Sequence, residues 1–329
     1  MKPMHKVTGA DVAKRAGVSR ATVSYVLNNT PGQTIPDDTR QRVKDAATAL
    51  GYVPQMAGRT LRRGRSDLVA CVLPDWPIGP AMGSLIEQLS AEAASRRYTL
   101  ALLRHSAADQ PLESAIRTLS PAALVVMEEL PASTSRMAKL MNVPVVSTLD
   151  PDDAVSGVVE SQLDIGATQV RHLVAAGHRR IAYLYPADER VRMFADTRFR
   201  GAEREAKAQG IEPLDRVDAP LDRLHLKHTA ERWKAAGITA VVSYNDEWAM
   251  GLMSGMQLLD LRAPDDLAII GVDDVPTAAV ASPPLTTIRQ IVAPMATSIF
   301  DRVALQLGER PRKPIVDAHS IELIVRDSA

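Results

Sequence analysis

The sequence predicts an α/β fold preceded by a small all-α head, and two observations carry this prediction. After Ser66, short apolar runs alternate with helix-length segments, whereas residues 1–65 show only short helical patterns broken by glycine and proline. The two parts also differ in charge, because residues 1–65 carry 12 Lys and Arg against 4 Asp and Glu, while the remainder carries 27 against 35. This charge asymmetry indicates that the head binds a polyanion. The alternative is a solvated basic tail, which does not explain the helical patterns in the same residues.

Three short helices are predicted in the head. Thr8 is positioned to cap the first helix, and Gly17 ends it. Ser19 is positioned to cap the second, and the third begins at Pro36 and ends at Gly51. Two helices joined by so short a turn cross at a steep angle, which is typical of a helix-turn-helix.

The body is predicted to be a doubly wound α/β domain. Its apolar runs are nearly continuous and strand-length, as expected for parallel strands buried on both faces. These runs are 68–74, 98–104, 122–127, 143–149, 180–185, 239–244 and 267–272. The segments between them include helix-length stretches at 81–97, 161–177, 198–209 and 245–260.

Polar residues directly follow several of these apolar runs. Asp75, Asn245 and Asp273 occupy such positions. Ligands of open α/β sheets bind outside the carboxyl ends of the strands, so these three side chains are candidate ligand groups. The alternative is helix capping, a frequent role of Asp and Asn.

Several functional classes lack support in the sequence. The N-terminal residues show no signal peptide, and no apolar stretch is long enough to span a membrane, so a cytoplasmic protein is expected. The single cysteine, Cys71, lies in an apolar run and is expected to be a buried thiol. No nucleophile elbow, phosphate loop or cysteine cluster is present, and His225 and His228 lack a third ligand at a recognisable spacing. No enzyme activity, cofactor or metal is therefore expected.

The head resembles that of the lac repressor family of transcriptional regulators through DVAKRAGVSRATVSYVLNN, TRQRVKDAATALGYVP and AGRTL. The resemblance implies a helix-turn-helix DNA-binding domain over 1–53 and a hinge helix over 54–65. It implies that the second helix enters the major groove. Carried over by position, the DNA-contacting residues are Thr8, Ser19, Arg20, Ala21, Thr22, Ser24, Tyr25, Asn28, Arg59, Leu61 and Arg62.

The residues expected at base edges have chemistry that fits only in part. Arg20 can donate a bidentate pair of hydrogen bonds to guanine, and Tyr25 can bond or stack, but Ala21 offers only a contact with a thymine methyl. Arg20 could instead be an exposed residue of a helix N-terminus. Thr22 and Ser24 are expected to bond phosphate.

In the hinge, the resemblance implies that Leu61 wedges into the minor groove and partly unstacks the neighbouring bases. Gly58 stands where the family usually has alanine. Glycine costs about 1 kcal/mol more than alanine inside a helix, so this hinge is expected to fold less readily.

The body shares the resemblance through VRHLVAAGHRRIAYL, TRFRGAEREAKAQG, TAVVSYNDEWAMG and DDLAIIGVDD. This implies a periplasmic-binding-protein-like effector domain over 66–329. Its N-subdomain is expected at about 66–177 and 290–318, and its C-subdomain at about 178–289 and 319–329. The effector-binding residues expected in the cleft are Asp75, Trp76, Asp164, Arg198, Asn245 and Asp273; the resemblance implies the last four, and Asp75 and Trp76 directly follow the first strand.

An arginine and carboxylates that face one cleft suit the hydroxyls of a sugar or a related polar metabolite. The family usually has an Asn-Pro-aromatic-aromatic run where this chain has WPIGPAMG, so Trp76 either replaces the missing aromatic wall or simply packs. Arg198 could alternatively pair with Glu203 or Glu205 on a helix surface.

The resemblance implies a sequence-specific transcriptional regulator, a repressor, that binds palindromic operator DNA as a homodimer under the control of a small effector, and the basic head agrees with it. The two alternative functions are an enzyme and a solute sensor without a DNA role. Enzyme motifs are missing, and a solute sensor needs no basic helix-turn-helix head.

Overall fold

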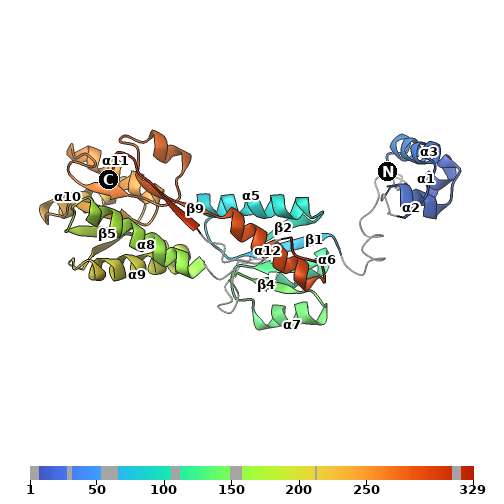
Figure 1. Ribbon diagram of the computed structural model, residues 1–329, viewed down its shortest axis with the longest axis horizontal. Coiled ribbons are helices and arrows are strands. Elements are labelled where there is room, and N and C mark those ends of the chain that lie inside the picture. Colours follow the sequence, from blue (N-terminus) through green and yellow to red (C-terminus); the bar gives the residue numbers. More distant parts are fainter. Residues whose placement is uncertain are drawn as a thin grey trace, which may run out of the picture. The chain divides into compact units, whose positions relative to one another are not determined.

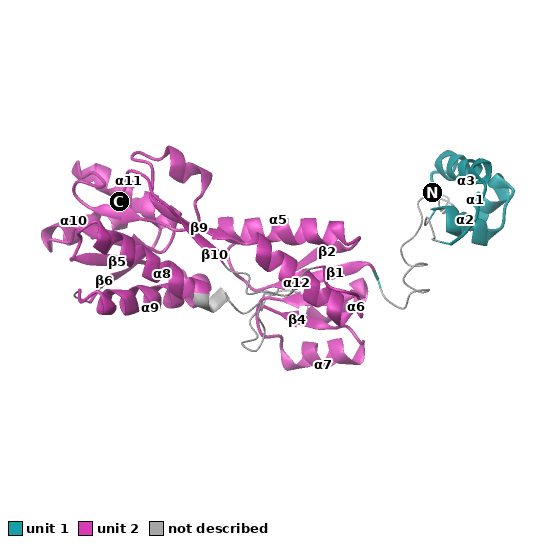
Figure 2. Ribbon diagram, viewed as in Figure 1, with its two compact units in different colours: residues 1–66 teal, residues 67–329 magenta. Residues whose placement is uncertain are grey.

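The computed structural model describes residues 7–27, 32–52, 66–104, 112–148, 158–211, 213–312 and 320–329. The chain divides into two compact units, Met1–Ser66 and Asp67–Ala329 (Figure 2). The all-α head and the α/β body predicted from the sequence are both present. None of the helices in the described ranges has the length and apolar character needed to cross a membrane.

The first unit is built on three helices, α1 (Gly9–Ala16), α2 (Arg20–Leu27) and α3 (Asp37–Ala49). Each helix turns its small apolar side chains toward the other two, which gives the unit a core of its own. The core residues are Val12, Ala13, Ala16, Val23, Val26, Val43, Ala46 and Ala47.

The turn between α1 and α2 explains how the second helix is oriented. Gly17 has a φ of 66°, a left-handed conformation that ends α1. Ser19 then caps α2, because its Oγ accepts a hydrogen bond from the backbone N–H of Thr22 at 3.1 Å. At the start of α1, the N–H of Thr8 donates to the Asp11 carboxylate at 2.8 Å. The predicted helix starts at Thr8 and Ser19 are confirmed.

The second unit contains two sheets, and the lobe built on the first sheet is called the N-lobe. Its four parallel strands follow the order β2-β1-β3-β4. They are β1 (Leu68–Leu73), β2 (Thr99–Arg104), β3 (Ala123–Val126) and β4 (Val145–Ser147). The central strands β1 and β3 are almost fully buried, as their continuous apolar runs predict.

Helices cover both faces of this sheet. Val69 and Cys71 of β1 pack against one pair of helices, and Ala70 and Val72 pack against the other. The first pair is α5 (Pro80–Ser95) and α12 (Ala293–Gln306), and the second is α6 (Leu112–Leu119) and α7 (Ala132–Leu140). Side chains alternate along a strand, so every second residue belongs to the same layer.

The lobe built on the second sheet is called the C-lobe. Its parallel strands follow the order β6-β5-β7-β8. They are β5 (Ile181–Pro186), β6 (Asp215–Ala219), β7 (Ala240–Ser243) and β8 (Ala268–Ile270). Helices α8 (Val158–Ala175) and α9 (Arg192–Ala208) cover one face, and α10 (Arg223–Ala235) and α11 (Asp246–Met256) cover the other. Short 3₁₀ helices are η2 (Glu189–Val191), η3 (Gln257–Leu259) and η4 (Pro276–Val280).

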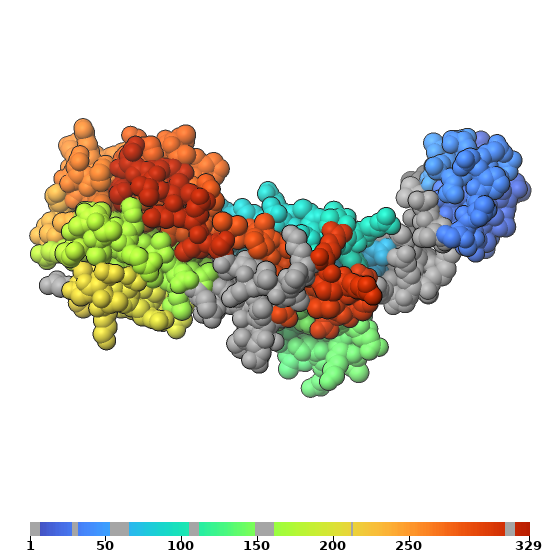
Figure 3. Space-filling model, viewed as in Figure 1, coloured from blue at the N-terminus to red at the C-terminus, as the bar shows by residue number. Residues whose placement is uncertain are grey.

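A two-stranded antiparallel ribbon, β9 (Thr287–Ile291) and β10 (Ser320–Ile324), connects the lobes. It begins beside β8, where the N–H of Gly271 donates to the carbonyl of Thr286 at 2.9 Å. After β9 the chain enters α12, which packs in the N-lobe (Figure 1). Residues of the red C-terminal part of the chain are therefore seen on both lobes (Figure 3).

Two details of the predicted organisation differ from the structure. Helix α8 packs through Val170 and Leu173 on the C-lobe sheet, so the chain leaves the N-lobe before α8 and not near residue 177. Helix α9 begins at Arg192, six residues before the predicted 198, which puts Arg198 in the middle of the helix.

Candidate functional site

The α2 surface of the head divides into a packed side and an accessible side. Val23 and Val26 face the core, at 3% exposure each. Arg20 and Ala21 are exposed, and Thr22, Ser24 and Tyr25 are half-buried. Of the predicted DNA-contacting residues, Asn28, Arg59, Leu61 and Arg62 lie outside the described residues. Thr8 and Ser19 are engaged in the caps described above.

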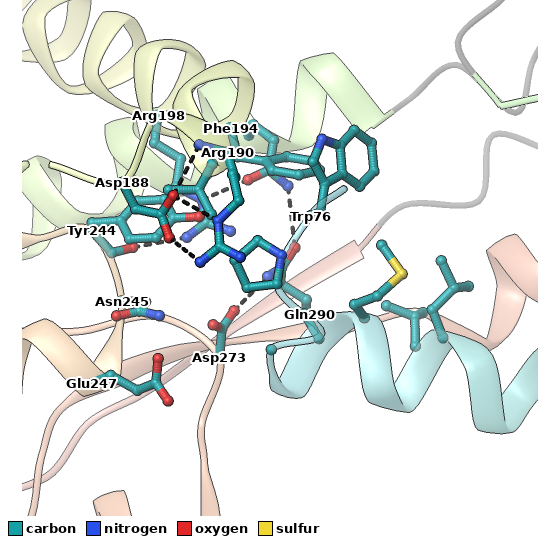
Figure 4. A pocket seen from close by; sticks show the side chains of 18 of the residues that line it. Trp76, Asp188, Arg190, Phe194, Arg198, Tyr244, Asn245, Glu247, Asp273 and Gln290 are labelled. Atoms are coloured by element: carbon teal, nitrogen blue, oxygen red, sulfur yellow. Dashed lines mark hydrogen bonds and ion pairs between the residues drawn. The ribbon is translucent and has the colours of Figure 1, made fainter. Parts of the chain in front are cut away.

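A second candidate site is a cavity of about 280 Å³ between the N-lobe and the C-lobe. It is lined by the loop after β1, by α5 and by the start of α12 on one side. The opposite side includes α8, η2, α9, the start of α11, β9 and the segments after β6, β7 and β8 (Figure 4). The carboxyl ends of both sheets thus meet at the cavity, as expected for ligand sites of open parallel sheets.

A chain of four hydrogen-bonded side chains forms one polar wall of this cavity. The Nε of Arg198 donates to Oε1 of Gln162, and Nε2 of Gln162 donates to Oε1 of Gln290 at 3.1 Å. Nε2 of Gln290 in turn donates to Oδ1 of Asp273 at 2.7 Å (Figure 4). These residues come from α9, α8, β9 and the segment after β8, so the wall depends on the packing of four separate segments.

Arg198 is only 4% exposed, and its partners among the described residues include no carboxylate. Besides Gln162 it bonds the carbonyl of Tyr244, through Nη1 at 2.8 Å, and its guanidinium lies 4.8 Å from the centre of the Tyr244 ring. The alternative of surface pairing with Glu203 or Glu205 is excluded by this burial. By contrast, the exposed Arg190 at the cavity edge pairs with Asp188 at 2.7 Å.

Asn245 is both a helix cap and a residue of the cavity lining. Its Oδ1 caps α11 by accepting the N–H of Trp248 at 3.1 Å, and the residue also lines the cavity. The next residue, Asp246, is fully buried behind the wall, where its carboxylate accepts hydrogen bonds from Thr287 and from the N–H of Val275. Burial raises the pKa of the Asp246 carboxyl to about 7, although both hydrogen bonds act in the opposite direction.

The remaining cavity surface is largely apolar. Trp76 in the loop after β1 packs edge-to-face on Phe194 of α9, with ring centres 4.7 Å apart, so this aromatic pair joins the two lobes beside the cavity. The N-lobe adds Met82, Leu85 and Met295 among other apolar side chains.

The structure brings Trp76, Arg198, Asn245 and Asp273 together around the cavity, but not the other two predicted effector residues. Asp75 is exposed and pairs with Arg104 at 2.7 Å. Asp164 is exposed on α8, whereas Gln162, two residues earlier, lines the cavity. Helical periodicity is the reason, since residues two apart face different directions.

Several cavity residues were missed by the sequence interpretation. Asp188 follows β5 just as Asn245 follows β7, so the strand-end rule could have found it. Gln162 and Gln290 carried no such signal. Among the described residues, no group of three His, Cys, Asp or Glu side chains is arranged to hold a metal ion.

Comparisons with known proteins agree with the two units. Residues 9–55 match the family described as bacterial regulatory proteins, lacI family, and residues 170–329 match the periplasmic binding protein-like domain. The transcriptional regulator reg1 of Streptomyces lividans is 31% identical, over 97% of this chain and 95% of that protein. The transcriptional repressor PurR of Mannheimia succiniciproducens is 28% identical, over 97% of both.

Solved structures show the same architecture. A lac repressor dimer bound to operator and the anti-inducer ONPF matches with a TM-score of 0.75 at 23% identity, over 98% of this chain and 99% of that one. A complex of the regulator CelR with cellobiose matches with a TM-score of 0.63 at 23% identity, over 98% and 100%. At this identity the likeness shows a shared fold.

Proposed function

This chain belongs to the lacI family of bacterial regulatory proteins and is a DNA-binding transcriptional regulator, not an enzyme; from this premise we propose that it is a repressor whose operator affinity is set by a small molecule in the interlobe cavity. The observation that carries the proposal is the pairing of two features in one chain. One is an accessible α2 surface with Arg20 at its start, and the other is a cavity with a polar wall around Arg198.

The DNA half of the proposal rests on the chemistry of α2. Arg20 can donate to guanine O6 and N7, Tyr25 can bond or stack, and Thr22 and Ser24 suit phosphate. One such head reads only a few base pairs, so a homodimer on a palindromic operator supplies the needed specificity. The lac repressor structure similar to this chain is itself described as a dimer bound to operator.

The effector half rests on the cavity. Arg198, Asn245 and Asp273 offer donors and acceptors to a small ligand with hydrogen-bonding groups, and Trp76 offers an aromatic face. A sugar is the class expected from the sequence, and CelR, similar in fold, is described in complex with cellobiose. A ligand that binds both lobes would favour one arrangement of the lobes over another, which is how it would reach the heads.

The test is a selection of random double-stranded DNA by the purified full chain, followed by fluorescence anisotropy titration of the selected sequence. The proposal predicts a two-fold symmetric consensus that is bound in the nanomolar range at physiological salt. Recovery of no consensus, or of an asymmetric one bound by a monomer, contradicts it.

A further inference from the structure

We infer that the effector is an amphipathic carboxylate and not a free sugar. Its carboxylate group would lie at Arg198, and its apolar part would lie against the N-lobe. This inference rests on the proposed function, because it concerns the ligand of the same cavity. It starts from the unequal chemistry of the two cavity walls.

The N-lobe wall offers almost nothing to a hydroxyl group. Among the described residues of that wall, Thr148 and the indole N–H of Trp76 are the only polar side-chain groups. The rest of the wall consists of apolar side chains and glycine: Pro77, Gly79, Ala81, Met82, Leu85, Met127, Val292 and Met295. Every sugar hydroxyl turned toward this wall would lose its hydrogen bonds to water without replacement, which is unfavourable.

The same wall suits an apolar ligand body. Met82, Met127 and Met295 are unbranched and polarisable, so they adapt to the outline of a ring or an alkyl chain. The cavity volume of about 280 Å³ is small for a ligand site. It accommodates a ligand with one ring, a short linker and a carboxylate group. The aromatic pair of Trp76 and Phe194 lies along this space.

The opposite wall carries Arg198, a buried cation that makes no ion pair with a carboxylate of the described residues. Arg198 bonds only the neutral oxygens of Gln162 and Tyr244, and its Nη2 has no hydrogen-bond partner among the described residues. Two partly buried arginines elsewhere in the described chain do pair with acids. Arg96 contacts Asp301 at 2.7 Å, and Arg326 contacts Asp274 at 2.6 Å.

A buried charge is normally paired, and Arg198 has no acidic partner among the described residues, so it points to a ligand group that is negatively charged. A carboxylate can accept the hydrogen bonds that an arginine donates in parallel, which a single hydroxyl cannot. Asp273 does not take this place, because its carboxylate makes no ion pair with Arg198 and its Oδ1 accepts a hydrogen bond from Gln290. The carboxylate group of the ligand therefore lies at Arg198, and its apolar part extends toward α5 and α12.

The experiment uses the full chain and four small-molecule probes that separate the contribution of the carboxylate group from that of the apolar part. 3-Phenylpropanoate has both a carboxylate group and an apolar part. D-Gluconate has only the carboxylate, 3-phenylpropan-1-ol has only the apolar part, and D-glucose has neither. Binding is measured by isothermal titration calorimetry, with the shift in Tm as a second readout. The inference predicts that 3-phenylpropanoate binds at least tenfold more tightly than each of the other three.

Phenylacetate, 4-phenylbutanoate and octanoate are titrated as well, so that a wrong linker length is not mistaken for a wrong class. If D-glucose or D-gluconate binds more tightly than every apolar acid, the inference is overturned, while the proposed effector cavity stands. If no apolar acid binds at millimolar concentration, the inference is also overturned. Neither result alters the DNA selection, which tests the proposed function separately.

Two variants locate the bound probe. Arg198→Met removes the charge but keeps an unbranched side chain, and it is expected to abolish the preference for 3-phenylpropanoate over 3-phenylpropan-1-ol. Met82→Gln places a polar group in the apolar wall and is expected to weaken 3-phenylpropanoate binding at least fivefold. Met193→Gln is the matched control, because Met193 is 39% exposed and does not line the cavity. Equal effects of Met82→Gln and Met193→Gln on 3-phenylpropanoate binding would contradict the placement of the ligand's apolar part against the N-lobe.

Discussion

Gly166 of α8 lies directly against the backbone carbonyl of Arg198 in α9, so closely that a Cβ atom at residue 166 would overlap that oxygen. The contact is reciprocal along the crossing, since a Cβ on Gly201 would overlap the carbonyl of Leu163. The two glycines allow the helix backbones to touch. This close approach is what brings Gln162 within hydrogen-bonding distance of Arg198.

Gly166→Ala is expected to lower the stability of the second unit by about 1–3 kcal/mol, because the added methyl group forces α8 and α9 apart. All three tryptophans of the chain lie in this unit, so their fluorescence during urea unfolding reports its midpoint. Gly83→Ala on α5 is the control, since nothing lies within 4 Å of a Cβ built there. It should leave the midpoint unchanged or raise it. Equal midpoints for the two variants would show that the crossing tolerates a side chain.

The raised pKa of Asp246 predicts that the second unit loses stability as pH rises. Between about pH 4 and pH 7 the folded state keeps a proton that the unfolded chain has released, so the free energy of unfolding decreases through this range. The slope is at most about 1.4 kcal/mol for each pH unit. Asn at this position keeps the size and can still bond Thr287 and Val275, but it does not ionise.

Asp246→Asn should therefore flatten the dependence of the urea midpoint on pH between pH 5 and pH 8. The control is Asp265→Asn, at an exposed aspartate of the same lobe, which should keep the wild-type slope. Parallel curves for the wild type and Asp246→Asn would contradict the assignment of the titration to Asp246.

At the DNA surface, Arg20→Ala is expected to weaken binding to the selected operator by about 1–3 kcal/mol and to relax the preference at one base position. Arg42→Ala removes the same charge from the same unit, but Arg42 lies on α3 in an exposed pair with Asp38 at 3.1 Å. Anisotropy titrations with operator variants separate the two. A similar loss for both variants, without a change in preference, would mean that Arg20 contributes only charge.

Salt should weaken operator binding strongly, because lysine and arginine contacts with phosphate release counterions from the DNA. Residues 1–65 carry 12 Lys and Arg, which is ample for several such contacts. We expect the affinity to fall by about 10³-fold between 50 and 200 mM salt. A flat dependence would speak against the α2 surface as the DNA-binding face.

Much of this fold could be predicted because its signals are local. The caps at Thr8 and Ser19, the turn at Gly17 and the apolar runs of β1, β3, β5 and β7 all depend on residues near them in sequence. The strand β6 was missed, because it lies at the edge of its sheet and alternates charged with apolar residues. The ribbon of β9 and β10 was missed because its strands pair across a long separation in sequence.

The sequence by itself determined the division into a basic head and an α/β body and the helix-turn-helix, and it marked Arg198, Asn245 and Asp273 as candidate ligand residues near strand ends or in a matching motif. Only the tertiary structure decided which side chains share the cavity. Gln162 and Gln290 are 128 residues apart in sequence, yet they are hydrogen-bonded neighbours, and Asp164 faces away from the same space. The neutral partners of Arg198 are also a tertiary property, because the contacts of its guanidinium with Gln162 and with the carbonyl of Tyr244 depend on the packing of distant segments of the described chain.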